Sequence, residues 1–88
     1  MRLLKFSSGS ERKFRRFFKK QPGLNIKAKL IIAILVKNPF EQSVGAHKLT
    51  GRFRFQYSAD INYKYSILYS FDNNFIYLIN IGTHDEVY

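Results

Sequence analysis

The sequence contains no cysteine. A disulfide framework and a thiolate zinc site are therefore both excluded, and the core has to be held by packing alone. The sequence also lacks any run of the roughly 20 apolar residues that would span a bilayer. Its first residues meet Lys5 before a secretory apolar segment could develop. These absences predict a soluble protein that needs no processing and no membrane, and a reducing cytoplasm fits the lack of cysteine.

Acidic residues are scarce as well: six Asp/Glu stand against 15 Lys/Arg, which gives a formal net charge of +9. The imbalance lies entirely in residues 1–37, where eleven basic residues face one acid, Glu11, whereas residues 38–88 hold four basic and five acidic residues. Such an excess suits a polyanionic partner, either nucleic acid or a strongly acidic protein. A solvated basic face with no specific partner is the alternative.

Two helices are expected in the basic half of the chain. Over residues 10–20, Ser10 can cap a helix whose three phenylalanines, at i, i+3 and i+4, form one apolar stripe among basic residues. We expect this stripe, Phe14, Phe17 and Phe18, to belong to the core. The Pro-Gly pair that follows ends this helix, and a second helix is expected over residues 25–37, where Asn38–Pro39 stops it.

Strands are expected on both sides of these helices. Residues 2–6 form a short apolar run that could sit inside a sheet. From residue 52 onward apolar and polar side chains alternate, which predicts strands over 52–60 and 63–71, followed by an Asp-Asn-Asn turn and a third strand over 75–81. This third strand is apolar on both faces, as expected for the inside of a sheet.

The length and the order of these elements predict one α+β domain spanning residues 1–88. In this two-layer, β-α-α-β-β-β arrangement, a helical hairpin covers one face of a mostly antiparallel four-stranded sheet. The other face keeps only the even-numbered polar side chains and is left open. Any active site in so short a chain should be open and shallow.

The open face is the expected place for chemistry. If the register is right, Arg52, Arg54 and Lys64 project from it and can hold phosphates or stabilise the charge of a phosphoryl-transfer transition state. Equally, these cations can simply keep an exposed sheet soluble. His47 precedes the sheet section and His84 follows it, which offers two imidazoles that can titrate near neutrality if they lie close together.

The terminal segment, residues 82–88, is rich in groups capable of chemistry. Its His-Asp-Glu run matches no common zinc or calcium spacing, because adjacent residues point in different directions, so a metal site is a minor alternative and no cofactor is expected. RNA can be cleaved without metal, since its own 2′-hydroxyl attacks the neighbouring phosphate once a base removes the proton and an acid protonates the leaving oxygen. The sheet offers a base, an acid and cations.

Two segments, residues 47–51 (His-Lys-Leu-Thr-Gly) and 81–88 (Ile-Gly-Thr-His-Asp-Glu-Val-Tyr), resemble motifs of the RelE/ParE superfamily of type II toxin–antitoxin toxins. Within it, the chain is similar to the messenger-RNA interferase branch that includes YafQ- and YoeB-like proteins. The resemblance covers nearly the whole chain and implies the fold predicted above. It also implies metal-independent cleavage of mRNA on the ribosome, and inhibition by a cognate antitoxin with an acidic or amphipathic helix.

The resemblance further implies roles for individual residues. His47 and His84 correspond to catalytic histidines, and Asp60 falls where relatives place another histidine or acid. Either Asp60 or Asp85 would orient a histidine. The residues expected to hold RNA are the phosphate-binding Arg52, Arg54, Lys64 and Lys48, and Tyr88, which would stack on a base.

One departure from the family pattern concerns Ser66, where many relatives carry an arginine in the middle strand. Lys64, two positions back on the same face, could substitute for that cation, although it is displaced by roughly 7 Å along the strand. The replacement therefore predicts a slow or partly decayed enzyme. Two non-ribonuclease alternatives share the fold: a ParE-like toxin that inhibits gyrase, and a member that binds RNA without cutting it.

Overall fold

A computed structural model describes residues 1–87, apart from the side chain of Glu86. The role expected for Tyr88 lies outside these described residues. The elements follow the predicted α+β order, with a five-stranded mixed sheet instead of the expected four strands. Their bounds are β1 Leu3–Phe6, α1 Ser10–Lys20, α2 Asn25–Lys37, β2 His47–Lys48, β3 Tyr57–Asp60, β4 Tyr65–Phe71, β5 Phe75–Thr83 and α3 His84–Val87.

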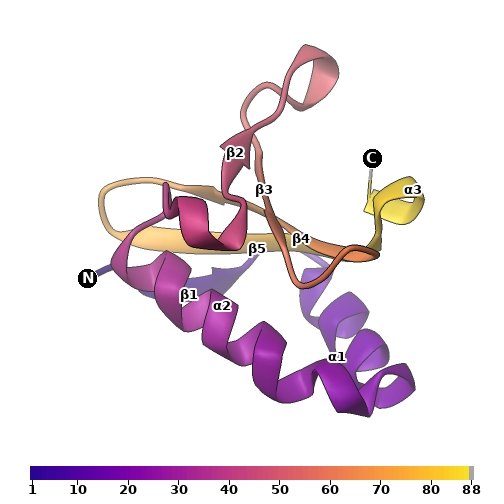
Figure 1. Cartoon of the computed structure of the whole chain (residues 1–88). Coiled ribbons are helices and arrows are strands. Elements are labelled where there is room, and N and C mark those ends of the chain that lie inside the picture. Colours follow the sequence, from indigo (N-terminus) through magenta and orange to yellow (C-terminus); the bar gives the residue numbers. More distant parts are fainter. Residues whose placement is uncertain (88) are drawn as a thin grey trace.

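The two long helices lie on one side of the sheet, and the short α3 lies on the other (Figure 1). Both long helices end where the sequence predicts. α1 begins at Ser10 itself, with Gly9 in the capping position, and the Ser10 hydroxyl donates to the carbonyl of Leu78 at 2.7 Å instead of capping the helix. No helix in the described part of the chain is both long enough and apolar enough to cross a membrane.

The sheet has the strand order β1-β5-β4-β3-β2. β5 lies inside it, as its apolar faces predict, and pairs in parallel with β1 and antiparallel with β4. The expectation that residues 2–6 form an interior strand is wrong, because β1 is an edge strand whose residues are all exposed. A short apolar run predicts that a strand forms, but it does not predict whether the strand lies at the edge or in the interior of the sheet.

The strand expected over residues 52–60 begins only at Tyr57. Gly51 adopts a φ of 66° and opens a 3₁₀ turn over Gly51–Phe53, which is closed by local bonds from the amides of Phe53, Arg54 and Gln56. Because these amides donate inside the loop, they cannot join the sheet. The added strand, β2, pairs antiparallel with β3, with His47 opposite Ser58.

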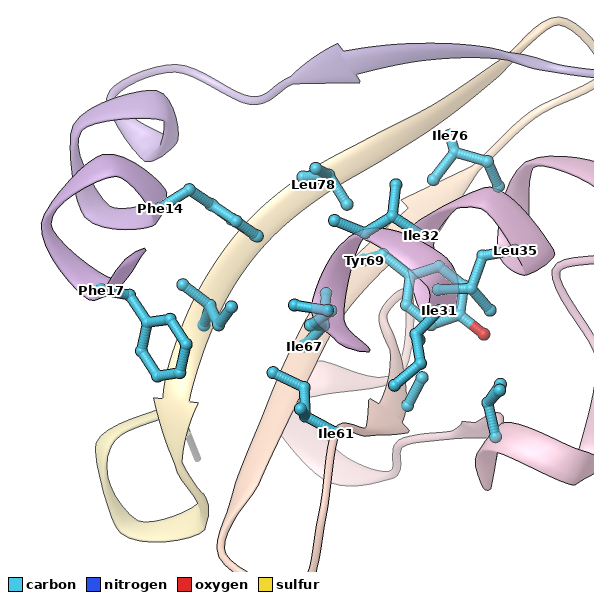
Figure 2. Packing of buried hydrophobic residues seen from close by; sticks show 14 residues of the cluster. Phe14, Phe17, Ile31, Ile32, Leu35, Ile61, Ile67, Tyr69, Ile76 and Leu78 are labelled. Carbon is cyan, nitrogen blue, oxygen red and sulfur yellow. The ribbon is translucent and has the colours of Figure 1, made fainter. Parts of the chain in front are cut away.

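Figure 2 shows the core between the helices and the sheet. Phe14 and Phe17 of α1 are buried, which confirms the predicted apolar stripe, and Phe18 packs against the same cluster from its edge. Tyr69 is the largest fully buried side chain among the described residues, and its hydroxyl donates to the carbonyl of Pro39 at 2.6 Å. This hydrogen bond ties the middle of the sheet to the loop that follows α2.

The opposite face is less open than expected. Ser58 and Ser66 are 0% exposed and Leu68 is 2% exposed, although all three occupy even-numbered positions. Val87 of α3 is also buried, and α3 stands on this side of the sheet (Figure 1). The short terminal helix therefore covers part of the face that the alternation predicts to be wet.

Candidate active site

Three polar side chains meet where β3, β4 and β5 lie side by side. Asp60 of β3 is paired with Ser66 of β4, and Ser66 is paired in turn with Gly82 of β5. Two residues after Gly82 the chain enters α3 at His84, which brings this imidazole back over the middle strand. The Ser66 hydroxyl donates to Oδ1 of Asp60 at 3.1 Å and lies 3.1 Å from Nδ1 of His84.

These three residues form a hydrogen-bonded array that we call the Asp60–Ser66–His84 array. Its members differ in their access to solvent: Asp60 is exposed, His84 is half-buried and Ser66 is fully buried. A serine hydroxyl between a carboxylate and an imidazole can connect the two groups in one hydrogen-bonded network, because a hydroxyl both donates and accepts a hydrogen bond.

His47 is held by the backbone of Gly45, a residue that borders Asp60. Its Nδ1 lies 2.8 Å from the carbonyl oxygen of Gly45, and since a carbonyl only accepts, Nδ1 carries the hydrogen. Gly45 lies directly against Asp60: a Cβ added at Gly45 would stand 2.6 Å from Oδ2 of that aspartate. Gly45 therefore contacts both sides of the candidate site: its carbonyl accepts from His47, and its lack of a side chain leaves room for the carboxylate of Asp60.

The backbone register sets the separation of the two histidines. His47 is paired with Ser58, and Asp60 lies two residues further along β3, about 7 Å away. β2 and β4 are separated by one strand, and Ser58 is paired with Leu68, two residues from Ser66, which places the backbones of His47 and Ser66 about 12 Å apart. Asp60 and Ser66 thus lie between the two segments that carry the imidazoles.

The cations expected on the sheet lie elsewhere. Arg52 and Arg54 do not project from the sheet face as predicted, because they belong to the loop before β3, where their guanidinium groups stack over Phe53 and Phe55 at 4.7 and 4.6 Å from the ring centroids. In Figure 1 this loop extends away from the sheet on the side of α3.

The prediction that Lys64 lies inside a strand is wrong. Lys64 precedes β4, is exposed, and holds its ammonium 5.3 Å from the centroid of the Tyr65 ring. Lys48 is exposed on β2 opposite Tyr57. Asp85 is exposed at the second position of α3. Among the residues described, no group of three or more His, Asp or Glu side chains is placed to hold a metal ion.

A basic hollow that the sequence did not locate borders the end of β5. It has a volume of about 450 Å³, and among its lining residues are Lys13, Arg16 and Lys20 of α1, together with Tyr65 and Gly82. The three cations share one stripe of the helix, at i, i+3 and i+7, which the sequence displays. Their position beside Gly82, the partner of Ser66, depends on how α1 packs on the sheet.

Sequence reasoning missed two functional candidates. In the sequence, Ser66 is notable only because relatives carry an arginine at this position. The strand register shows that its hydroxyl joins Asp60 to His84. Gly45 is one loop residue among several, and its role depends on its φ of 68° and its close approach to Asp60.

No protein-family model matches the sequence, and no curated protein matches it. Solved structures do match. YafQ from Escherichia coli superposes with a TM-score of 0.83 at 16% identity, over 100% of this chain and 99% of that one. The Escherichia coli DinJ–YafQ toxin–antitoxin complex gives 0.80 at 18% identity over 99% and 97% of the two chains. The YoeB–YefM complex from Staphylococcus aureus gives 0.79 at 22% identity over 96% and 99%. The chain has the fold of YafQ and YoeB.

Proposed function

We propose that this RelE-like fold carries the toxin activity that the resemblance implies: a metal-independent endoribonuclease that cuts mRNA on the ribosome and so inhibits translation in the cytoplasm. The observation that carries the proposal is the Asp60–Ser66–His84 array, with His47 bonded to the carbonyl of Gly45, which borders the same aspartate. The likeness to YafQ and YoeB supports the fold on which such an array would act.

The proposed chemistry needs one proton acceptor and one proton donor. One imidazole of the His47 and His84 pair takes the proton from the 2′-hydroxyl, and the O2′–P bond forms as the P–O5′ bond breaks. The other imidazole gives its proton to the leaving O5′, so the products are a 2′,3′-cyclic phosphate and a 5′-hydroxyl. Asp60 orients His84 through Ser66, and Asp85 is an exposed carboxylate next to His84 in the chain.

Cations for the RNA come from outside the strands. Arg52 and Arg54 on the extended loop, with Lys48 and Lys64 near the ends of β2 and β4, would contact phosphates on either side of the cut. Tyr88 would stack on a base, a contact worth roughly 1–3 kcal/mol in other systems. The basic hollow lined by α1 adds a second set of cations next to β5.

The proposed partner is a cognate antitoxin with an acidic or amphipathic helix. YafQ, whose fold this chain shares, is found in a toxin–antitoxin complex with DinJ. The net charge of +9, with its basic excess in the half of the chain that contains α1, favours an acidic segment by electrostatic complementarity.

The test compares the protein, freed of antitoxin, with its His84→Ala and His47→Ala variants on ribosomes carrying a defined mRNA in the presence of EDTA. Cuts are mapped by primer extension. The wild type is expected to cut, and each variant is expected to lose about 10²- to 10⁴-fold in rate, the usual contribution of a general acid or base. Asn73→Ala, in the exposed turn between β4 and β5, is the control and should cut normally. A wild type that leaves ribosome-bound mRNA intact refutes the proposal.

A second candidate, a ParE-like toxin that binds gyrase, is favoured by one feature. The loop before β3 presents Phe55, which is 74% exposed, with the Arg54 guanidinium over its ring. Such a pair suits a protein surface as well as RNA. Expression of the protein would then induce a DNA-damage response instead of arresting translation.

A further inference from the structure

We infer that Ser66 is a positioning residue that fixes His84 in the tautomer with hydrogen on Nδ1, so that Nε2 is the nitrogen which exchanges protons with substrate. The inference rests on the proposed function for its catalytic meaning, but its structural content can be measured without any activity. It replaces the expectation that Ser66 merely records a lost arginine.

The number of hydrogens available to Ser66 and Asp60 determines the tautomer of His84. The Ser66 hydroxyl has a single hydrogen, and Oδ1 of Asp60, 3.1 Å away, belongs to a carboxylate that can only accept when it is ionised. That hydrogen is therefore committed to Asp60. The contact of 3.1 Å between Oγ and Nδ1 of His84 then requires Nδ1 to donate, whether the imidazole is neutral or charged. In the neutral ring, the lone pair is left on Nε2.

Burial makes this arrangement firm. Ser66 is 0% exposed, so water does not compete for its hydroxyl. Register holds the two ends of the array, because Ser66 is directly paired with both Asp60 and Gly82, and Gly82 is two residues from His84. Gly45 has no side chain and so leaves room for Oδ2 of Asp60 while Oδ1 accepts from Ser66.

The chemical consequence concerns the orientation of the His84 ring. A carboxylate that acts on the Nδ1 side of an imidazole fixes the tautomer and the orientation of the ring. Here the carboxylate of Asp60 acts on His84 through the hydroxyl of Ser66. His84 thus has a hydrogen-bond partner at the position of β4 where the family pattern predicts an arginine. Ser66 itself is too short and too deeply buried to touch RNA.

The test is the nitrogen-15 chemical shifts of the two histidines, obtained from long-range proton–nitrogen correlation spectra at mildly alkaline pH, where imidazole is neutral. Wild-type His84 is expected to show hydrogen on Nδ1. In Ser66→Ala it is expected to shift toward hydrogen on Nε2, the form that free imidazole side chains favour in water. His47, whose Nδ1 donates to a backbone carbonyl, should keep its tautomer in both proteins and is the internal reference.

Ser10→Ala is the matched control, because Ser10 is also a buried serine, 1% exposed, whose hydroxyl donates a hydrogen bond on the far side of the sheet. It should lower stability without altering His84. Wild-type His84 with its hydrogen on Nε2 overturns the inference, and so does an unchanged His84 in Ser66→Ala. Since the wild-type spectrum alone decides the first point, a variant that fails to fold does not prevent the test.

The rate of mRNA cleavage then tests whether this positioning matters for catalysis. Ser66→Ala is expected to lower kcat by on the order of 10- to 100-fold with KM unchanged, the effect of removing an orienting partner from a functional histidine. Ser66→Thr, which keeps the hydroxyl, should restore both the tautomer and part of the rate. If the wild type cuts no mRNA but His84 carries hydrogen on Nδ1, the proposed function fails and the positioning stands. If the wild type cuts mRNA but His84 carries hydrogen on Nε2, the positioning fails and the proposed function stands.

Discussion

Replacing Gly45 with alanine is expected to destabilise the protein more than the same replacement at either of two comparable glycines. Gly45, Gly9 and Gly51 all have left-handed backbone, with φ of 68°, 77° and 66°. Alanine in this conformation costs about 1–2 kcal/mol at any of the three positions. A Cβ at Gly9 or Gly51 meets nothing within 4 Å, whereas at Gly45 it stands 2.6 Å from Oδ2 of Asp60.

The additional cost at Gly45 follows from what Asp60 has to give up. A separation of 2.6 Å is far inside the 3.4 Å at which ordinary contact begins, so the carboxylate must turn away. Turning Asp60 takes Oδ1 from the Ser66 hydroxyl, and a buried donor without its acceptor costs about 1–3 kcal/mol. The alternative is for that hydroxyl to donate to His84, which forces the other tautomer.

Urea unfolding followed by circular dichroism measures the three variants side by side. Gly45→Ala is expected to lose about 1–3 kcal/mol more than Gly51→Ala, and its His84 nitrogen shifts should move as those of Ser66→Ala do. Equal losses for Gly45→Ala and Gly51→Ala, within about 0.5 kcal/mol, together with unchanged His84 shifts would refute the reasoning that links Gly45 to the array.

Two further predictions concern stability. Tyr69→Phe leaves the buried Pro39 carbonyl without its donor and should cost about 1–3 kcal/mol at neutral pH. Because burial, and then Tyr57, raise the pKa of Tyr69, its contribution is present below the ordinary value of 10.0 and lost above it, so urea midpoints at alkaline pH should fall less steeply in the variant. The Tyr77 hydroxyl, and then backbone amides, lower the pKa of Asp72, so its contribution is present above 3.8 and lost as pH falls. In Asp72→Asn the urea midpoint should therefore fall less steeply than in the wild type as the pH is lowered. Equal slopes of the urea midpoint against acid pH in the two proteins would contradict this.

The helices can be predicted from sequence because their signals are local. The spacing of Phe14 and Phe17, and the Asn-Pro pair that stops the second helix, act within one or two turns of chain. The alternating half is harder. Residues 52–56 alternate as a strand does, yet arginines that stack on neighbouring phenylalanines satisfy the same pattern in a loop.

The candidate site can be predicted only in part. The sequence indicates Asp60 and His84, but the hydroxyl that joins them looks like a defect, since nothing in the local sequence tells which strands flank Ser66. The expected position of Arg52 and Arg54 on the sheet face is wrong, because both lie in the loop before β3. These errors share one cause. Alternation places odd- and even-numbered side chains on opposite faces of a sheet, but this holds only for residues that are in a strand.

The parallel pairing of β1 with β5 has a consequence for how the molecule is made. Leu3 pairs with Phe75 and Phe6 with Leu78, so the first strand has no partner until the last strand exists. Contacts this distant in sequence form late and slow the folding of a small domain. The nine residues of β5 also lead straight into His84. A nascent chain therefore completes its sheet and acquires its second histidine in the same step, and no shorter intermediate on the ribosome can contain the complete Asp60–Ser66–His84 array.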